Sequence, residues 1–184
     1  MLDAFGTERY HLSNELAHLD NRGDAAMLSL TDGQTLAADL VVCADGIRST
    51  GRRIMVPDAQ PRYAGYVAWR GTVDRAEISG RSASILLDAF TYQILPHGHL
   101  LTYAIPGPGG SALFNWLWYQ NIAPGEQLTD LLTDRNGFSA ELTVPPWSVQ
   151  TRHVAQLYSA AAELPSSLAE VVQRTAEPFG PGIG

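Results

Sequence analysis

Residues 38–53, ADLVVCADGIRSTGRR, constrain the fold of this chain more than any other segment. Residues 40–44 form an apolar run without polar alternation, which is typical of a strand buried on both faces. Asp45-Gly46 follows as a turn dipeptide that tolerates positive φ, and residues 49–53 are typical of the opening of a basic helix. These three parts together predict a place where backbone N–H groups and side chains hold a phosphate or a ribose. The alternative is an ordinary strand–turn–helix junction with a solvated basic end.

The rest of the pattern predicts strands first and helices last. A helix tail is expected at residues 1–6 and a hairpin of two strands at residues 10–19 and 25–30. A turn at residues 31–34 and a strand toward Leu40 follow, and then a helix at about residues 48–55 that ends before Pro57. Apolar segments separated by turns at residues 96–99 and 106–110 then predict an open antiparallel meander. Its expected strands are residues 63–73, 83–89, 91–95, 100–105 and 112–119. The helices expected after it are residues 124–132, 151–163 and 165–174.

Composition narrows the class of protein. The chain has 184 residues, of which 45% are hydrophobic and 17% charged, as in a globular domain with its own core. Its 12 basic and 19 acidic residues give a net charge of −7, which argues against binding to nucleic acid or to anionic membranes. Because the apolar runs are shorter than the ~20 residues that span a bilayer, and the first residues resemble no secretory signal, a cytoplasmic protein is expected. The lone cysteine, Cys43, excludes an internal disulfide and is expected to be buried.

The spacing Asp45-Gly46-x-x-Ser49-x-x-Arg52 resembles the second cofactor motif of the flavin-dependent aromatic hydroxylases, which are single-component FAD monooxygenases that use NADH or NADPH. Other segments are similar to the same family, and most of all to its branch that acts on dihydroxypyridine-type rings. They are Tyr10-His11-Leu12, residues 66–71 (YVAWRG), residues 113–119 (LFNWLWY) and Val144-Pro145-Pro146. The resemblance implies that Asp45 and Gly46 approach the ribose and pyrophosphate of the flavin. It also implies that Arg52 lies where the nicotinamide cofactor docks and that Ser49 is a hydrogen-bonding helix residue.

The resemblance further implies an α+β fold, in which a partial, Rossmann-like FAD-binding domain is fused to an antiparallel β-sheet substrate domain. The expected divisions are residues 1–62 for the FAD-binding part, 63–150 for the substrate sheet and 151–184 for a truncated helical return segment. The implied cofactors are FAD and NAD(P)H, and the implied partners are O₂ and a small aromatic or N-heteroaromatic substrate. The ring would be hydroxylated through a flavin hydroperoxide, with the chemistry supplied by the cofactor. No catalytic base can be assigned; the substrate, the choice of NADH or NADPH, and a homodimeric state all stay open.

Two motifs of the family do not occur in the sequence. Neither the Gly-x-Gly-x-x-Gly turn that brings the backbone close to the pyrophosphate nor the Gly-Asp pair that heads the family's long final helix is found. Residues 106–110 are rich in glycine, but two prolines make them a hairpin turn. We therefore expect an internal fragment that is inactive alone and binds FAD weakly or not at all. The alternatives are another flavoprotein, such as a lipid-chain reductase, and a truncated non-catalytic binding or assembly module. A halogenase is disfavoured, because the chain contains no lysine.

The aromatic residues Phe114, Trp116 and Trp118 alternate along one segment and are expected to pack against the sheet face. Arg70, on the strand that follows the motif, is expected to form a structural ion pair.

The five histidines suggest no metal site. His97 and His99 share one face of an extended segment, but no third ligand follows at a recognisable spacing. His11, His18 and His153 are expected at the surface.

Overall fold

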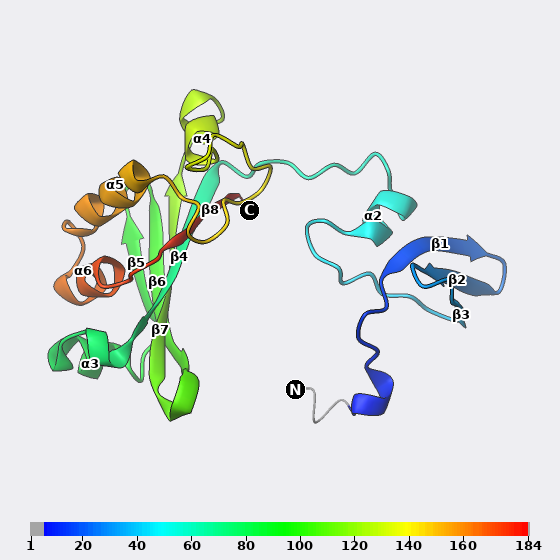
Figure 1. Ribbon diagram of the computed structural model, residues 1–184, viewed down its shortest axis with the longest axis horizontal. Helices are drawn as coiled ribbons and strands as arrows, with labels where there is room; N and C mark the ends of the chain where they lie inside the picture. Colours follow the sequence, from blue (N-terminus) through cyan, green and yellow to red (C-terminus); the bar gives the residue numbers. More distant parts are fainter. Residues whose placement is uncertain (1–5, 184) are drawn as a thin grey trace. The chain divides into compact units, whose positions relative to one another are not determined.

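The computed structural model describes residues 6–183 and contains two compact units, Met1–Arg62 and Tyr63–Gly184 (Figure 1). Each unit has an antiparallel sheet of its own combined with short helices, which confirms the expected α+β class. The helix tail expected at residues 1–6 falls almost entirely outside the described residues. Within residues 6–183, no helix is long and apolar enough to cross a membrane.

The first unit is a three-stranded sheet followed by a short helix. The strands lie in the order β1 (Leu16–Arg22), β2 (Ala25–Leu30), β3 (Thr35–Ala38), after the 3-10 turn η1 (Thr7–Arg9). Gly23 joins β1 to β2 with a φ of 65°, a left-handed conformation that favours glycine. The helix α2 (Thr50–Met55) ends before Pro57, as expected.

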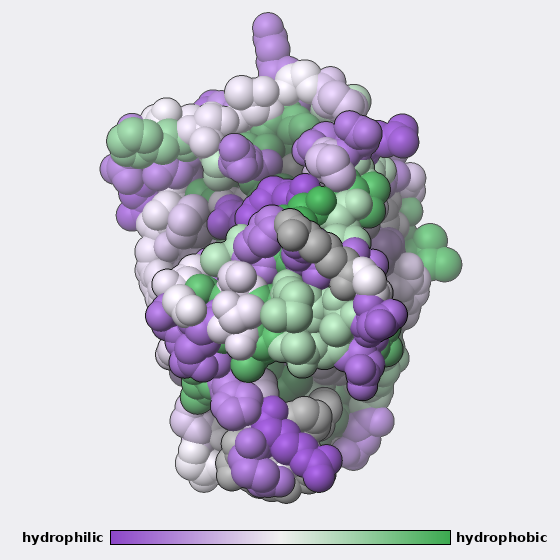
Figure 2. Space-filling view, turned by 90° about the vertical axis from the view of Figure 1, so that its right-hand side faces the viewer, coloured by the Kyte–Doolittle hydropathy of each residue, from purple (hydrophilic) through white to green (hydrophobic). Residues whose placement is uncertain are grey.

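The buried strand expected at residues 40–44 is wrong. This segment has no regular secondary structure and pairs with no described strand, and Leu40 and Val42 are 78% and 77% exposed. Cys43, which was also expected to be buried, is exposed. A strand is buried on both faces only where strands flank it and helices cover it, and the described part of the first unit supplies no flanking strand. Apolar side chains that lie open among hydrophilic ones are visible in Figure 2.

The second unit is built on a five-stranded antiparallel sheet with the order β5-β6-β7-β4-β8. The strands are β4 (Tyr66–Asp74), β5 (Thr91–Leu95), β6 (Gly98–Pro106), β7 (Ala112–Asn121) and β8 (Phe179–Ile183). The helices are α3 (Gly80–Leu86), α4 (Glu126–Leu131), α5 (Thr151–Ala161) and α6 (Ser166–Gln173), with 3-10 turns η2 (Arg75–Glu77) and η3 (Pro108–Gly110). The hairpin expected around residues 106–110 is confirmed, since β6 and β7 pair along their whole length.

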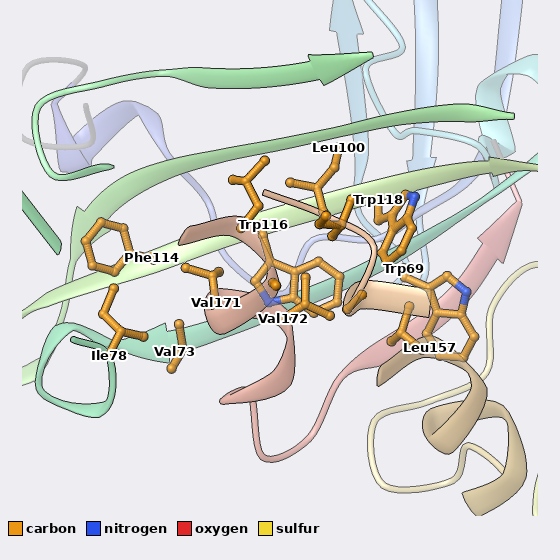
Figure 3. Close-up of a cluster of buried hydrophobic side chains, with 14 of the residues drawn as sticks. Trp69, Val73, Ile78, Leu100, Phe114, Trp116, Trp118, Leu157, Val171 and Val172 are labelled. Carbon is orange, nitrogen blue, oxygen red and sulfur yellow. The ribbon is translucent and has the colours of Figure 1, made fainter. Parts of the chain in front are cut away.

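Helices cover one face of this sheet. Alternate residues of β4 and β7, among them Trp69, Phe114 and Trp116, form a core with Leu157 of α5 and Val172 of α6 (Figure 3). Phe114 and Trp116 are fully buried, as their alternation predicted. Because α3, α5 and α6 lie on the same side of the sheet, the opposite face carries none of these helices (Figure 1).

The strand expected at residues 83–89 is wrong, because α3 occupies most of this segment. The Ser79 hydroxyl caps the helix by accepting a hydrogen bond from the Ser82 N–H at 3.3 Å. Glu170 of α6 then accepts hydrogen bonds from the Ser79 N–H at 2.7 Å and from the hydroxyls of Ser79 and Ser82 at 2.8 and 2.5 Å. These bonds, first that of Ser82, lower the pKa of Glu170. A carboxylate distant in sequence therefore stabilises the start of α3.

The C-terminal segment differs from expectation in two respects. The strand β8 was not expected in a sequence with two glycines and a proline, yet it pairs with β4 at the sheet edge, as in the register Ala68↔Gly182. His153 was expected at the surface, but it is 4% exposed and contacts Asp130 of α4. It lies on the side of α5 that faces the core, together with Leu157.

Candidate functional site

The Asp-Gly turn, residues 45–49, forms the start of α2 through its own hydrogen bonds. The Asp45 carboxylate accepts from the backbone N–H groups of Thr50 at 2.7 Å and Gly51 at 3.1 Å. The Ser49 hydroxyl accepts from the Arg52 N–H at 2.9 Å, so Ser49 is the N-cap of the helix. The amides of Thr50 and Gly51, which a phosphate would use, are therefore occupied by Asp45.

Asp45 remains ionised at any ordinary pH. The Ser49 hydroxyl and then the Gly51 N–H stabilise its charged form, and they lower the pKa of Asp45 from 3.8 to about 2. Gly46 has a φ of 72°, and nothing lies within 4 Å of the place where its Cβ would be. Glycine is thus favoured here because of its positive φ, and not because a neighbouring atom would clash with a Cβ. The turn presents a carboxylate that can accept hydrogen bonds from ligand hydroxyls.

The structure brings the four predicted site residues, Asp45, Gly46, Ser49 and Arg52, into this one turn, but the guanidinium of Arg52 has a local partner. Its Nη2 donates to the Ile47 carbonyl oxygen, while its buried Nε has no hydrogen-bond partner among the described residues. Gly51 was not predicted as a site residue. A Cβ at this position would lie 2.2 Å from the Cys43 sulfur, so only glycine lets the helix approach residue 43 this closely.

A hollow of about 700 Å³ lies beside the turn within the first unit. Asp45, Arg48 and Thr50 line it on one side, and Tyr10 and Leu28 line it elsewhere. Its volume lies within the range of small-molecule and cofactor pockets.

A second candidate surface is the helix-free face of the second unit's sheet. Four aromatic residues cross it from β5 to β4, and we call them the aromatic row: Tyr92, His99, Tyr119 and Tyr66. The His99 ring is stacked between Tyr92 at 4.9 Å and Tyr119 at 4.6 Å, measured between ring centroids. Tyr66 meets Tyr119 edge to face at 5.4 Å. Tyr92 is exposed and the other three rings are half-buried, so the row is a partly exposed surface with one imidazole within it.

Strand register creates this row. His99 lies opposite Tyr119, and Ala68 lies opposite Tyr119 on its other side, which brings Tyr66 diagonally next to it. From the sequence, His99 was predicted only as half of a histidine pair, and the row was not predicted. The alternation of residues in β6 and β7 places His99 and Tyr119 on one face of their strands. That these residues are neighbours follows only from the pairing of β7 with both β6 and β4.

Arg70 lies on β4, exposed, two residues beyond Ala68, so it shares the helix-free face. The ion pair expected for it is not found among the described residues. Within residues 6–183, no three His, Cys, Asp or Glu side chains gather into a group that could hold a metal ion.

Comparison with known proteins gives relatives over nearly the whole chain. It is 33% identical over 181 residues to 2,6-dihydroxypyridine 3-monooxygenase of Paenarthrobacter nicotinovorans, which covers 97% of this chain and 45% of that protein. Over 62 residues, 34% of this chain and 16% of the relative, it is 50% identical to 3-amino-4-hydroxybenzoate 2-monooxygenase of Streptomyces cremeus. The chain thus spans less than half the length of these relatives.

Solved structures agree with this result. The structure of 2,6-dihydroxypyridine-3-hydroxylase from Arthrobacter nicotinovorans matches with a TM-score of 0.83 and 33% identity, over 99% of this chain and 46% of that one. A salicylate hydroxylase–substrate complex matches with a TM-score of 0.60 and 18% identity, over 94% of this chain and 41% of that one, which shows a shared fold.

The family model described as FAD binding domain-like matches residues 63–183, which are the second unit. The relatives are flavin-dependent monooxygenases, as the resemblance in the sequence implied. The chain belongs to the FAD binding domain-like family.

Proposed function

We propose that this chain contributes to an enzyme that uses FAD and NAD(P)H to hydroxylate an aromatic or N-heteroaromatic ring with O₂. The observation that carries the proposal is the aromatic row. Its stacked rings lie on an open sheet face, in a chain whose relatives hydroxylate dihydroxypyridine and aminohydroxybenzoate. A planar substrate ring gains contact area and favourable quadrupole interactions against such a surface.

In this proposal His99 positions the substrate. It is the imidazole of the row, and a ring nitrogen at its edge can exchange a hydrogen bond with a hydroxyl or ring nitrogen of the substrate. Its two stacked tyrosines hold the imidazole plane, so the orientation of that hydrogen bond is set before the substrate binds. Arg70 on the same face adds a positive charge that favours the ionised form of a ring hydroxyl.

FAD, reduced by NAD(P)H, would supply the activation of O₂. The residues present fit one part of this cofactor: Asp45 is an exposed, ionised carboxylate beside a hollow, and it suits the ribose hydroxyls. We assign Asp45 and Gly46 to the ribose side, Ser49 to supporting the helix start, and Arg52 to the nicotinamide cofactor. For this last role the Arg52 guanidinium must leave the Ile47 carbonyl.

The division into residues 1–62, 63–150 and 151–184, a homodimeric assembly and a cytoplasmic location belong to this proposal as predictions. A second candidate function is a non-catalytic assembly module. It is favoured by the exposure of Leu40 and Val42, since apolar side chains left open at a surface promote association. Light scattering of the purified chain separates a monomer from a defined dimer or a heterogeneous aggregate.

A chimera tests the enzymatic proposal. Residues 1–184 replace the matching segment of the Paenarthrobacter nicotinovorans enzyme. With 2,6-dihydroxypyridine as the substrate, NADH oxidation and formation of the hydroxylated product are both measured. We expect product formation, and we expect His99→Ala to raise KM about tenfold through loss of one substrate hydrogen bond and of the ring that holds the two tyrosines in place.

His97→Ala is the matched control, because His97 is exposed in the turn next to β6 and lies outside the row. A chimera that folds and binds FAD but forms no product would contradict the proposed function. Equal KM values for the two histidine variants would contradict the role of the aromatic row.

A further inference from the structure

A separate cavity of about 300 Å³ lies in the second unit, between the sheet and the helices α4 and α5. It is lined from the helix-covered side of the sheet by Trp69 of β4 and Gln120 of β7. The aromatic row lies on the opposite face, so the two sites do not share a wall. Its volume is at the lower end of the range of ligand pockets, about 300–1,000 Å³.

The cavity combines apolar surface with several polar side chains. Trp69 and Leu157 are buried core residues and form its apolar part. Its polar residues are Gln120, Gln127, Asp130, His153 and Gln156. Half of its ten lining residues are polar and half are apolar. A small ligand held here would therefore combine hydrogen bonds with apolar contact.

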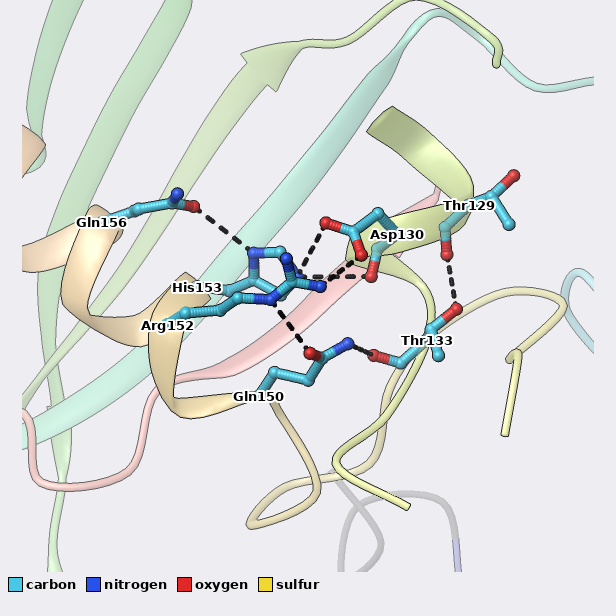
Figure 4. A network of polar contacts seen from close by, with 7 residues as sticks. All are labelled: Thr129, Asp130, Thr133, Gln150, Arg152, His153 and Gln156. Atoms are coloured by element: carbon cyan, nitrogen blue, oxygen red, sulfur yellow. Dashed lines mark hydrogen bonds and ion pairs between the residues drawn. The ribbon is translucent and has the colours of Figure 1, made fainter. Parts of the chain in front are cut away.

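A network of polar contacts holds one wall in place (Figure 4). His153 Nε2 lies 3.2 Å from the carbonyl oxygen of Asp130 and 3.5 Å from its carboxylate, and Nδ1 lies 3.4 Å from Gln156 Oε1. The Arg152 guanidinium donates to the Asp130 carboxylate and, at 3.0 Å, to Gln150 Oε1. Gln150 Nε2 in turn donates to the Thr133 carbonyl oxygen at 2.8 Å. These bonds join α5 to α4, so the wall is formed before any ligand arrives.

The charges of the wall, and its side chains that lack a hydrogen-bond partner, indicate which class of ligand the cavity fits. Asp130 is paired with Arg152, so the wall has no unpaired charge to offer to an ion. The side-chain amides of Gln120 and Gln127 have no hydrogen-bond partner within residues 6–183, and each amide offers both a donor and an acceptor. A ligand that also carries a donor and an acceptor side by side pairs best with such groups.

We propose that this cavity binds a small uncharged amide, such as a lactam or a carboxamide, at a site distinct from the aromatic row. Its N–H and C=O pair with the glutamine amides, and its carbon skeleton lies against Trp69 and Leu157. An anion is disfavoured, because Arg152 is already paired with Asp130 and the wall offers no unpaired positive charge.

The test uses the purified chain with 2-piperidone, a saturated lactam that has no aromatic ring to stack on the tyrosines. Ligand-observed NMR detects binding, and a titration gives Kd for the chain and its variants. Gln127→Leu is at an exposed position of α4, so the fold is expected to tolerate it, and Gln120→Leu removes the other free amide. Each is expected to weaken binding about fivefold, the loss of one hydrogen bond. Ala160→Trp, which fills the cavity from α5, is expected to abolish the binding of 2-piperidone.

The controls separate this site from the proposed active site. Gln60→Leu in the first unit and His99→Ala in the aromatic row should leave the Kd of 2-piperidone unchanged. No binding of 2-piperidone, tighter binding of acetate than of 2-piperidone, or a loss of affinity in His99→Ala would each overturn the proposal. The result does not depend on FAD or on turnover, so it stands or falls separately from the hydroxylase function.

Discussion

The buried hydrogen bond between Trp116 and Thr175 anchors the end of α6 to the sheet. Trp116 Nε1 donates to Thr175 Oγ1 at 2.7 Å, and that hydroxyl donates to the Val171 carbonyl oxygen at 2.9 Å. Trp116 is 0% exposed and Thr175 is 2% exposed, so water cannot replace either partner. Thr175→Val keeps the shape of the side chain but leaves the indole N–H unpaired in the core. We expect a loss of about 2–3 kcal/mol of unfolding free energy, because an unsatisfied buried donor costs about 1–3 kcal/mol and a second bond is lost with it.

Urea unfolding followed by far-UV circular dichroism measures this loss, which corresponds to a fall in Tm on the order of 10 °C for a unit of this size. Thr175→Ser is the matched control. It keeps the hydroxyl and removes only the methyl group that packs near Gly71, so it should cost about 1 kcal/mol. If Thr175→Val is no less stable than Thr175→Ser, the hydrogen bond between Trp116 and Thr175 does not stabilise the fold.

Four further predictions follow from other contacts. Gly71→Ala should cost about 1–3 kcal/mol in urea unfolding, because the new Cβ would lie 2.7 Å from the Trp116 ring; an unchanged midpoint would contradict this close packing. The pKa of Glu170 is lowered in the folded chain, so its stabilising effect is present above its unfolded pKa of 4.5 and is lost as pH falls through the folded value. Tm should therefore decline on acidification below that pH, and decline less in Glu170→Gln. NMR titration should place the pKa of Asp45 near 2, and Ser49→Ala should raise it toward 3.8; no rise would remove Ser49 as the main cause. The purified chain should lose FAD on dialysis, and retained flavin absorbance would show that the missing glycine motif is not needed.

Much of the fold could be predicted from local pattern. Strands β4 to β7 follow from apolar alternation and from the turns between them, and α5 and α6 follow from helical periodicity and their flanking prolines and polar residues. The start of α2 is equally local, because Asp45 and Ser49 bond to amides only a few residues away.

The errors all concern residues whose partners are distant in sequence. The segment of α3 was predicted as a strand from its local pattern, which does not show the contact with Glu170. This residue stabilises the start of α3 and is 91 residues from Ser79. His153 was predicted at the surface because its partner, Asp130, lies on another helix. Residues 40–44 have the composition of a central strand, but composition does not supply the neighbouring strands that would bury it.

The sequence by itself determined most strand and helix segments of the second unit, the position of the Asp-Gly turn and the family, because each depends on periodicity or on a short local motif. Tertiary structure alone decided which of these residues meet. Pairing of β7 with β6 and β4 assembled the aromatic row, and the packing of α4 and α5 on the other face formed the amide-lined cavity. Such sites arise from contacts between distant segments, and the register and packing that create them are properties of the whole sheet.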